Sequence, residues 1–211
     1  MYKRSFKEYS NKLYESLLSI DENKINQLLK EISIRMDGHS SIYFMGNGGS
    51  AANASHICGD YLKTFTILKQ KLKIFNLTDS SSYYTATVND IDQCDVFSIL
   101  VGKLIQKDDL LILLSGSGNS INLVKAAQKA KNLGIKLTSV TAYTGGALSK
   151  IADIPIHIFT NDMEIAEDGQ LSIFHHIKQH ISGLIENRIN LDDEYNISKK
   201  YLTRVNNDQI A

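Results

Sequence analysis

A histidine and a carboxylate four residues apart, His56 and Asp60, are the first side chains whose types and spacing could do chemistry. They follow a stretch of small residues that predicts a helix, and a spacing of four puts both side chains on one helical face. Such a pair can bind a divalent metal or exchange protons with a substrate. A polar stripe on a solvated helix is the plain alternative, and this pair alone favours that alternative.

A second set of such side chains lies in a later stretch with helical periodicity: Glu167, Gln170, His175, His176 and His180. His176 and His180 have the i, i+4 spacing of a zinc-binding pair. Glu167 and His175 are eight apart, which separates their Cα atoms by roughly 12 Å on a straight helix. That is long for two ligands of one ion, so either the helix begins irregularly at Asp168-Gly169 or two subunits contribute the residues. Scattered histidines on a solvated face are again the alternative.

Two short loops rich in glycine and serine could hold an anion. Residues 46–50 read GNGGS after the apolar run 42–45, and residues 115–120 read SGSGNS after the apolar run 110–114. Helical spacing follows each loop, so both predict strand, tight loop and helix. Glycines let backbone N–H groups turn inward, hydroxyls add donors, and the helix start adds the positive end of its dipole. One such loop could be an ordinary turn, but two in one chain favour a phosphate site.

The first loop also fits the relaxed dinucleotide pattern G-x-G-x-x-A, with Gly46, Gly48 and Ala51. This pattern expects an acidic residue about 20 residues later, at the end of the second strand. The available residue, Asp79, is further away, and the dinucleotide interpretation leaves the second loop unexplained. We therefore prefer the phosphate site.

These residues need a scaffold, and from residue 41 the pattern alternates between strand and helix. Strands are predicted near residues 41–45, 72–77, 110–114, 136–141 and 154–158, and helices near 49–64, 80–88, 92–105, 120–132 and 165–188. The alternation predicts an α/β fold, a three-layer sandwich with a mainly parallel five-stranded sheet. Partial alternation in residues 71–77 and the only proline, Pro155, indicate edge strands. Ligands bind such sheets beyond the carboxyl ends of the strands, where both loops and the polar run 79–90 lie.

Two amphipathic helices precede the first strand. Phe6, Tyr9, Leu13 and Leu17 recur at helical spacing, and Asp21 can cap a second helix that ends at residues 37–38. These helices either cover the sheet or pack against another subunit. We expect a single domain over residues 1–190, including the helical pair in 1–38, and a polar tail over 191–211.

Composition indicates an ordinary globular protein. The 211 residues are 43% apolar and 22% charged, and Lys+Arg and Asp+Glu are 23 each. This neutral balance argues against a nucleic-acid partner. Two cysteines, Cys58 in the predicted core and Cys94, form no disulfide framework and indicate a reducing compartment. No signal-like start and no membrane-length apolar run is present, so we expect a cytoplasmic protein without a membrane partner.

The motifs GNGGSAANASH, TVND and SGSGNS and the late EDGQ…HH helix resemble the sugar isomerase (SIS) domain family. Within it the chain is similar to the phosphoheptose isomerases, which interconvert sedoheptulose 7-phosphate and D-glycero-D-manno-heptose 7-phosphate. The resemblance covers roughly residues 1–188. It implies the SIS fold, a homotetramer with active sites near subunit interfaces, and a role in heptose precursor synthesis for lipopolysaccharide or capsule.

The resemblance also implies roles for single residues. In the two loops it implies a substrate-binding set of Asn47, Gly48, Ser50, Ser115, Gly116, Ser117 and Ser120, to which Asp90 and Glu167 add contacts. It implies one Zn²⁺ held by His56, Asp60, Glu167 and His175, with Asp60 and His175 as the catalytic acid–base pair.

Four positions depart from the family pattern. Asp60 stands where the family has the longer glutamate, and Glu167 where an amide is common. Gln170 replaces a common histidine, and Thr64 a common arginine. These changes leave a metal site in place and bear mainly on which sugar phosphate is bound.

The implied reaction moves one proton between neighbouring carbons and another between their oxygens, through an enediolate. It needs a base, an acid and a positive group beside the oxyanion. The alternative from another class is a non-catalytic SIS protein that binds a sugar phosphate, or a tetrameric adaptor of the DnaA-binding type.

Overall fold

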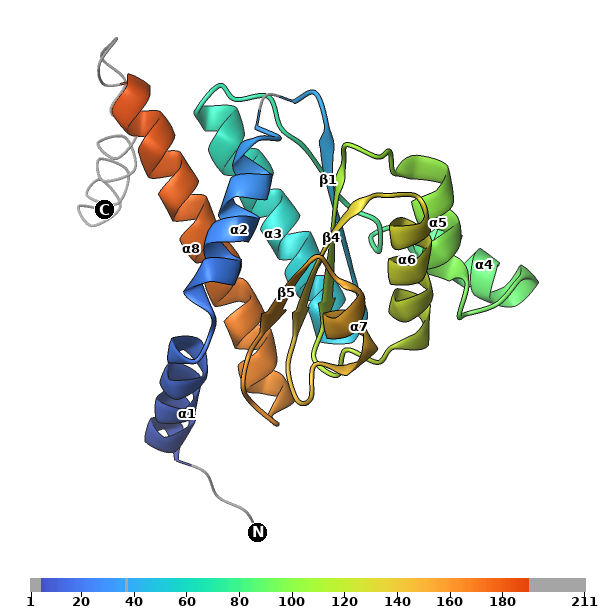
Figure 1. Ribbon diagram of the computed structural model, residues 1–211, viewed down its shortest axis with the longest axis horizontal. Helices are drawn as coiled ribbons and strands as arrows, with labels where there is room; N and C mark the ends of the chain where they lie inside the picture. Colours follow the sequence, from blue (N-terminus) through green and yellow to red (C-terminus); the bar gives the residue numbers. More distant parts are fainter. Residues whose placement is uncertain (1–4, 37, 190–211) are drawn as a thin grey trace, which may run out of the picture.

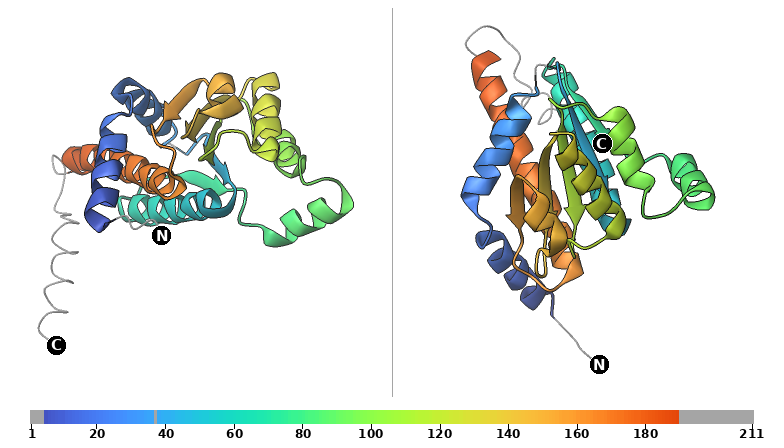
Figure 2. Two further views of the ribbon diagram at one scale, coloured as in Figure 1. Left: turned by 90° about the horizontal axis from the view of Figure 1, so that it is seen from below. Right: turned by 45° about the vertical axis from the view of Figure 1, so that its right-hand side comes forward.

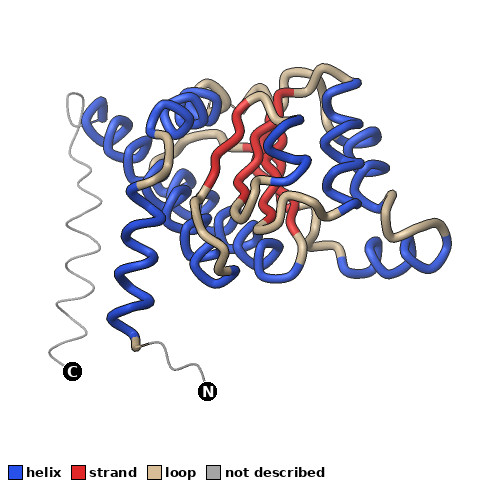
Figure 3. The backbone as a smooth tube through the Cα atoms, turned by 60° about the horizontal axis from the view of Figure 1, so that its bottom comes forward, coloured by secondary structure: helices blue, strands red, loops and turns tan. Residues whose placement is uncertain are grey.

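A five-stranded parallel sheet forms the centre of the computed structural model, which describes residues 5–36 and 38–189. The strand order is β2-β1-β3-β4-β5, and every neighbouring pair is parallel. The strands are β1 (Ser41–Gly46), β2 (Lys73–Asn76), β3 (Leu110–Ser115), β4 (Lys136–Thr141) and β5 (Ile154–His157). Figure 3 shows them enclosed by helices. The predicted α/β fold with a parallel five-stranded sheet is confirmed.

Helices cover both faces of the sheet (Figure 1). One face packs against α2 (Glu22–Ser33), α3 (Gly48–Ile67) and α8 (Met163–Ile189), and the other against α5 (Val96–Leu104), α6 (Ile121–Asn132) and α7 (Gly146–Ile151). The remaining helices, α1 (Phe6–Leu18) and α4 (Ser81–Asp90), lie at the periphery. The molecule is therefore a three-layer sandwich.

Strand β3 explains why residues 110–114 are all apolar. Leu110, Ile112 and Leu114 belong to the core under α3 and α8, whereas Leu111 and Leu113 belong to the core under α5 and α6. All five are fully buried. A central parallel strand is covered on both faces, so apolar residues occupy both faces.

The two N-terminal helices take different positions. Asp21 caps α2 by accepting the Asn23 N–H, as predicted, and α2 buries Leu28 and Ile32 against the sheet. Helix α1 is joined to α8 by the Tyr9 hydroxyl, which donates to Asp168 at 2.6 Å. Burial, with help from Asp168, raises the pKa of Tyr9 to about 12. The sheet cover thus comes from α2, and α1 packs against α8.

Element boundaries differ from the prediction in a few places. The helix expected near 92–105 begins at Val96, and α7 was not predicted because Gly145-Gly146 suggested an interruption. Gly145 is instead the left-handed N-cap of α7. Strands β2 and β5 are the sheet edges, as expected for residues 71–77 and Pro155. The predicted tail, 191–211, lies outside the described residues. Within the described residues, no helix is long and apolar enough to cross a membrane.

Asp153 fixes the start of β5 to the start of β4. Its carboxylate accepts the Leu137 N–H at 2.9 Å and pairs with the Lys131 ammonium. Burial opposes ionisation of this group, but Lys131 and the Leu137 N–H outweigh that effect and lower the pKa of Asp153.

Replacing Asp153 with Asn should lower the free energy of unfolding by about 1 kcal/mol at pH 7, after allowance for solvent screening. The depressed pKa means that the carboxylate stabilises the fold above its unfolded pKa, and that this contribution disappears as the pH falls through the folded pKa. Urea denaturation of both proteins at pH 7 and in acid measures the difference, with Asp108→Asn at an exposed side chain as control. If the two proteins differed by the same free energy of unfolding at pH 7 and in acid, the stabilising role of the Asp153 carboxylate would be contradicted.

Candidate active site

The sheet order creates a binding position between β1 and β3. The chain leaves β1 for β2 on one side and reaches β4 from β3 on the other, so the two loops diverge at a topological switch point. A pocket of about 270 Å³ opens there. It is lined by Asn47, Gly48, Gly49, Ser50, Leu114, Ser115, Gly116, Ser117, Ser120, Met163 and Glu167.

The loop after β3 presents three hydroxyls to this pocket. Ser115 Oγ accepts the Gly118 N–H at 3.1 Å, and Ser117 Oγ accepts the Asn119 N–H at 3.2 Å. Ser120 is the N-cap of α6, but its side chain makes no capping hydrogen bond. Gly118 has φ +66° and a Cβ there would lie 2.1 Å from the Gly145 oxygen, so only glycine fits. The loop is rigidly shaped, and Ser120 is its most available hydroxyl.

An asparagine pair ties the two loops together. Asn47 Nδ2 donates to Asn122 Oδ1 at 3.0 Å, and Asn122 Nδ2 donates back to Asn47 Oδ1 at 3.1 Å. Asn122 lies in the first turn of α6 and is buried. The helix starts of α3 and α6 are therefore held at a fixed separation on either side of the pocket.

Glu167 puts a carboxylate beside the first turn of α3. A Cβ built on Gly49 would lie 2.3 Å from both carboxylate oxygens. Burial, followed by the nearby Glu164 and Asp168, raises the pKa of Glu167. A helix N-terminus favours negative charge, so this side chain occupies a position that also suits an anionic ligand.

A buried polar network connects α8 to the first loop. Gln170 is 1% exposed. Its amide donates to Ser50 Oγ at 3.1 Å and accepts from Asn53 at 3.0 Å. Asn53 also donates to the Glu167 carbonyl at 2.9 Å. Helix α8 thus positions Ser50, a residue that lines the pocket.

Further along the same two helices, two imidazoles and a carboxylate converge. His56 Nε2 and His175 Nε2 are 3.0 Å apart, and Asp60 Oδ2 is 4.0 Å from His175 Nε2. One ligand atom from each of the three residues lies within 4.8 Å of the others. The Lys178 ammonium contacts Asp60 Oδ2. Burial, His56 and Lys178 lower the pKa of His175 against the opposing effect of Asp60, which favours the neutral ring that a metal requires.

The structure gathers most of the predicted site residues into two groups. The pocket contains every predicted residue of the two loops, and His56, Asp60 and His175 form the other group, which we call the His/Asp/His cluster. Glu167 lies in the pocket and does not join the His/Asp/His cluster within one chain. Helix α8 runs without interruption from Met163, so of the two alternatives for Glu167 and His175 an irregular helix start at residues 168–169 is wrong, and contribution from two subunits stays a prediction.

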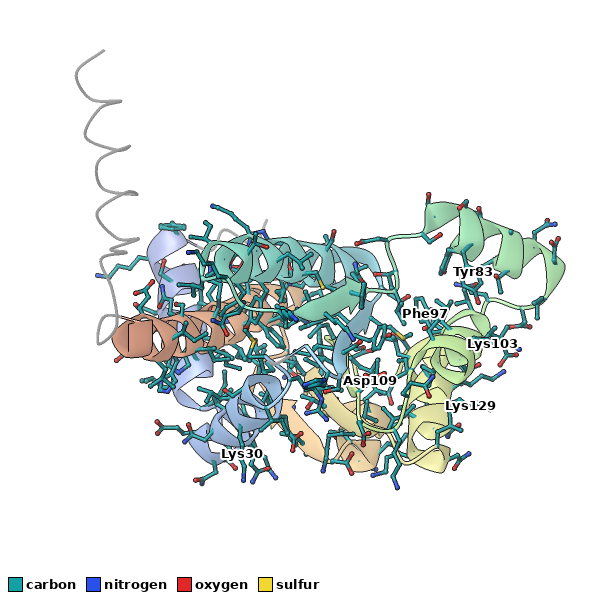
Figure 4. All side chains as sticks on the ribbon, turned by 90° about the horizontal axis from the view of Figure 1, so that it is seen from above. Lys30, Tyr83, Phe97, Lys103, Asp109 and Lys129 are labelled. Atoms are coloured by element: carbon teal, nitrogen blue, oxygen red, sulfur yellow. The ribbon has the colours of Figure 1, made fainter. Side chains whose placement is uncertain are left out.

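Three other candidates lie apart from both groups. Asp90 is exposed at the end of α4, where it accepts from Asn89 at 2.7 Å. Helix α4 stands away from the body (Figure 2) and is held to α5 by Tyr83, labelled in Figure 4, which donates to the Val96 carbonyl at 3.0 Å. His176 and His180 are exposed, and among the described residues no third metal-binding group accompanies them.

Sequence reasoning missed Lys178, Asn122, Asn53 and Met163. A signal existed for Lys178, because residues 167, 170, 174 and 178 recur at spacings of three and four and therefore share one face of α8. Asn122 and Asn53 lie on helices whose partners are far away in the chain, so their bonds appear only in the fold.

Comparisons with known proteins found similar sequences and a similar fold. The sequence model of the SIS domain matches residues 5–142. The phosphoheptose isomerase of Helicobacter pylori (strain P12) is 29% identical over 175 residues, which is 83% of this chain and 91% of that protein. The phosphoheptose isomerase of Synechocystis sp. (strain PCC 6803) is 31% identical over 157 residues, 74% and 81% of the two chains. The structure of a phosphoheptose isomerase from Francisella tularensis has a similar fold, with TM-score 0.78, 24% identity, and coverage of 84% and 94%.

Gly49→Ala should destabilise the protein by about 1–2 kcal/mol, because the new methyl group must displace the Glu167 carboxylate. In a Glu167→Ala background the same change should stabilise by about 1 kcal/mol, since alanine then has the better helix propensity. Gly59→Ala, on the same helix with nothing within 4 Å of its Cβ position, is the matched control and should stabilise in both backgrounds. Thermal denaturation of the set gives the coupling energy, and additive effects would contradict the Gly49–Glu167 contact.

Proposed function

Because the chain belongs to the SIS domain family, whose sequence model matches residues 5–142, we propose that it is a sugar-phosphate aldose–ketose isomerase. The substrate we propose is sedoheptulose 7-phosphate, converted to D-glycero-D-manno-heptose 7-phosphate for heptose precursor synthesis. Relatives named phosphoheptose isomerase that align over most of their length support this choice. We treat residues 1–190 as one catalytic domain in the cytoplasm, where the free thiols of Cys58 and Cys94 would stay reduced.

The observation that carries the proposal is that one helix pair bears both an anion-binding pocket and a proton-transfer cluster. Gly49 lines the pocket and His56 belongs to the His/Asp/His cluster. Seven residues of α3 separate them, or about 10 Å along the helix axis. An open-chain sugar with phosphate on its last carbon and its carbonyl at the other end suits that separation. The geometry therefore favours a long sugar phosphate.

The pocket would hold the phosphate through the Ser115, Ser117 and Ser120 hydroxyls and the N-terminal N–H groups of α6. This binding energy orients the reacting carbons, which lie several bonds from the phosphate. The carboxylate of Glu167 lines the same pocket, at a position where the family often has an amide, and we expect it to influence which sugar phosphate is accepted.

Asp60 and His175 would share the proton transfers. One carries the proton between the two carbons, and the other serves the oxygens. The lowered pKa of His175 favours the neutral ring, which can accept a proton at Nε2 when no ion is bound there. Both side chains are partly exposed, so a substrate can reach them.

The His/Asp/His cluster also fits a divalent metal, and we propose Zn²⁺. Its two Nε2 atoms are 3.0 Å apart, close to the roughly 3.3 Å that two nitrogens adopt around tetrahedral zinc. His56, Asp60 and His175 would hold the ion within one chain, and two imidazoles with a carboxylate are a donor set that zinc accepts. Bound Zn²⁺ would supply positive charge beside the carbonyl oxygen.

Two variants separate anchoring from chemistry. Ser120→Ala should raise KM for sedoheptulose 7-phosphate about tenfold with little change in kcat, because a hydroxyl donor to the charged phosphate is lost. Asp60→Asn keeps the shape but removes the charge, so kcat should fall at least about a hundredfold. Chelation should stop turnover and added Zn²⁺ should restore it, with metal content followed by elemental analysis.

Activity from the Asp60→Asn variant equal to that of an active parent would argue against Asp60 as a proton-transfer group. The non-catalytic alternative predicts instead that the parent protein binds the sugar phosphate and never converts it. Full activity in metal-free protein would show that the ion has no part in the mechanism, and Asp60 and His175 would then act as a plain acid–base pair.

We further propose a homotetramer. Three large apolar side chains of α1 are exposed: Phe6 (83%), Tyr14 (63%) and Leu18 (68%). An exposed apolar helix face of this kind is typical of a subunit interface. Asp90 lies on α4, which protrudes from the body, and in a tetramer it could contact the pocket of another subunit.

Light scattering at micromolar concentration should therefore give a mass of about four chains of 23.6 kDa. Phe6→Ser combined with Leu18→Ser should weaken the assembly while the monomer stays folded, because neither side chain is in the core. A monomeric parent protein would contradict the tetramer and any site shared between subunits.

A further inference from the structure

The positively charged ammonium of Lys178 lies against the carboxylate of the His/Asp/His cluster. Its ammonium contacts Asp60 Oδ2, and the two side chains are only 18% and 20% exposed. Oδ2 is also the carboxylate atom that lies 4.0 Å from His175 Nε2. Lys178 is three residues after His175 on α8, so both project toward α3 from neighbouring positions. The cluster therefore already contains a cation.

A lysine ammonium and a metal ion compete for such an oxygen. Each needs the lone pairs of Asp60 Oδ2, and each repels the other at short range because both are positive. Partial burial weakens solvent screening of that repulsion. The short Asp60 side chain also has less freedom than a glutamate to serve both partners at once.

We propose that Lys178 is an internal cation that holds Asp60 in the metal-free protein and lowers the affinity of the cluster for divalent ions. Metal binding then requires the ammonium to leave Asp60 Oδ2. This inference rests on the metal site of the proposed function. It assigns to Lys178 the control of metal affinity, a positioning role in which the lysine acts through Asp60.

Isothermal titration with Zn²⁺ alone, and with Co²⁺ followed by its visible absorbance, tests the assignment on the full chain. Lys178→Met should bind Zn²⁺ at least about tenfold more tightly than the parent, a change of about 1.4 kcal/mol. Lys178→Arg keeps the charge and should bind no more tightly than the parent. Lys150→Met, which removes one exposed charge from α7 on the opposite face of the sheet, is the control and should leave the affinity unchanged.

Equal or weaker Zn²⁺ binding by Lys178→Met would overturn the competition, because Lys178 would then help to build the site. Lys178→Gln gives the same comparison if the methionine variant folds poorly. Binding by Lys178→Met alone would support the proposal in its strongest form. Absence of binding in both proteins would overturn the metal site itself, and with it this inference, whereas isomerase activity would still be measurable independently.

Discussion

The parallel packing of α8 along α3 is the constraint on which the rest of the site depends. Tyr61 of α3 and Phe174 of α8 are buried, and the Tyr61 hydroxyl donates to the Phe174 carbonyl at 2.8 Å. This contact fixes the register, so that Gln170 meets Ser50 near the pocket and His175 meets His56 about one and a half turns later. A shift of α8 by one residue would turn these side chains about 100° away from their partners. One helix–helix interface thus positions Ser50 at the pocket and assembles the His/Asp/His cluster.

Much of this arrangement could be predicted from local sequence. The all-apolar run 110–114 indicated a central strand, and the order of strands and helices indicated the α/β sandwich. The two Gly/Ser loops indicated the pocket because parallel strands must place such loops at one sheet edge. The register of α8 against α3 could not be predicted. The separation of Glu167 from His175 on a continuous α8 divides them between the pocket and the His/Asp/His cluster, and no local pattern shows which residue of α3 each one meets.

Two charged side chains of α8 lie at the positions proposed for ligands. Glu167 puts a carboxylate where an anion would bind, and Lys178 puts an ammonium where a metal would bind. Both lie on the same face of α8, one at each end of the site. Each would make its site less favourable to a ligand of the same sign, so we expect both to act on ligand selection. Asp60 and His175, which we propose as the proton-transfer groups, lie beside the second of these charges.

The central claim is that this chain catalyses proton transfer in a bound sugar phosphate. Incubation with sedoheptulose 7-phosphate in D₂O, followed by NMR, tests that claim most directly, because isomerisation passes a solvent-exchangeable proton between C1 and C2. The account predicts an aldose product that carries deuterium at C2, formed by the parent protein and lost in His175→Ala. Binding of the sugar phosphate with neither aldose formation nor deuterium incorporation would contradict it.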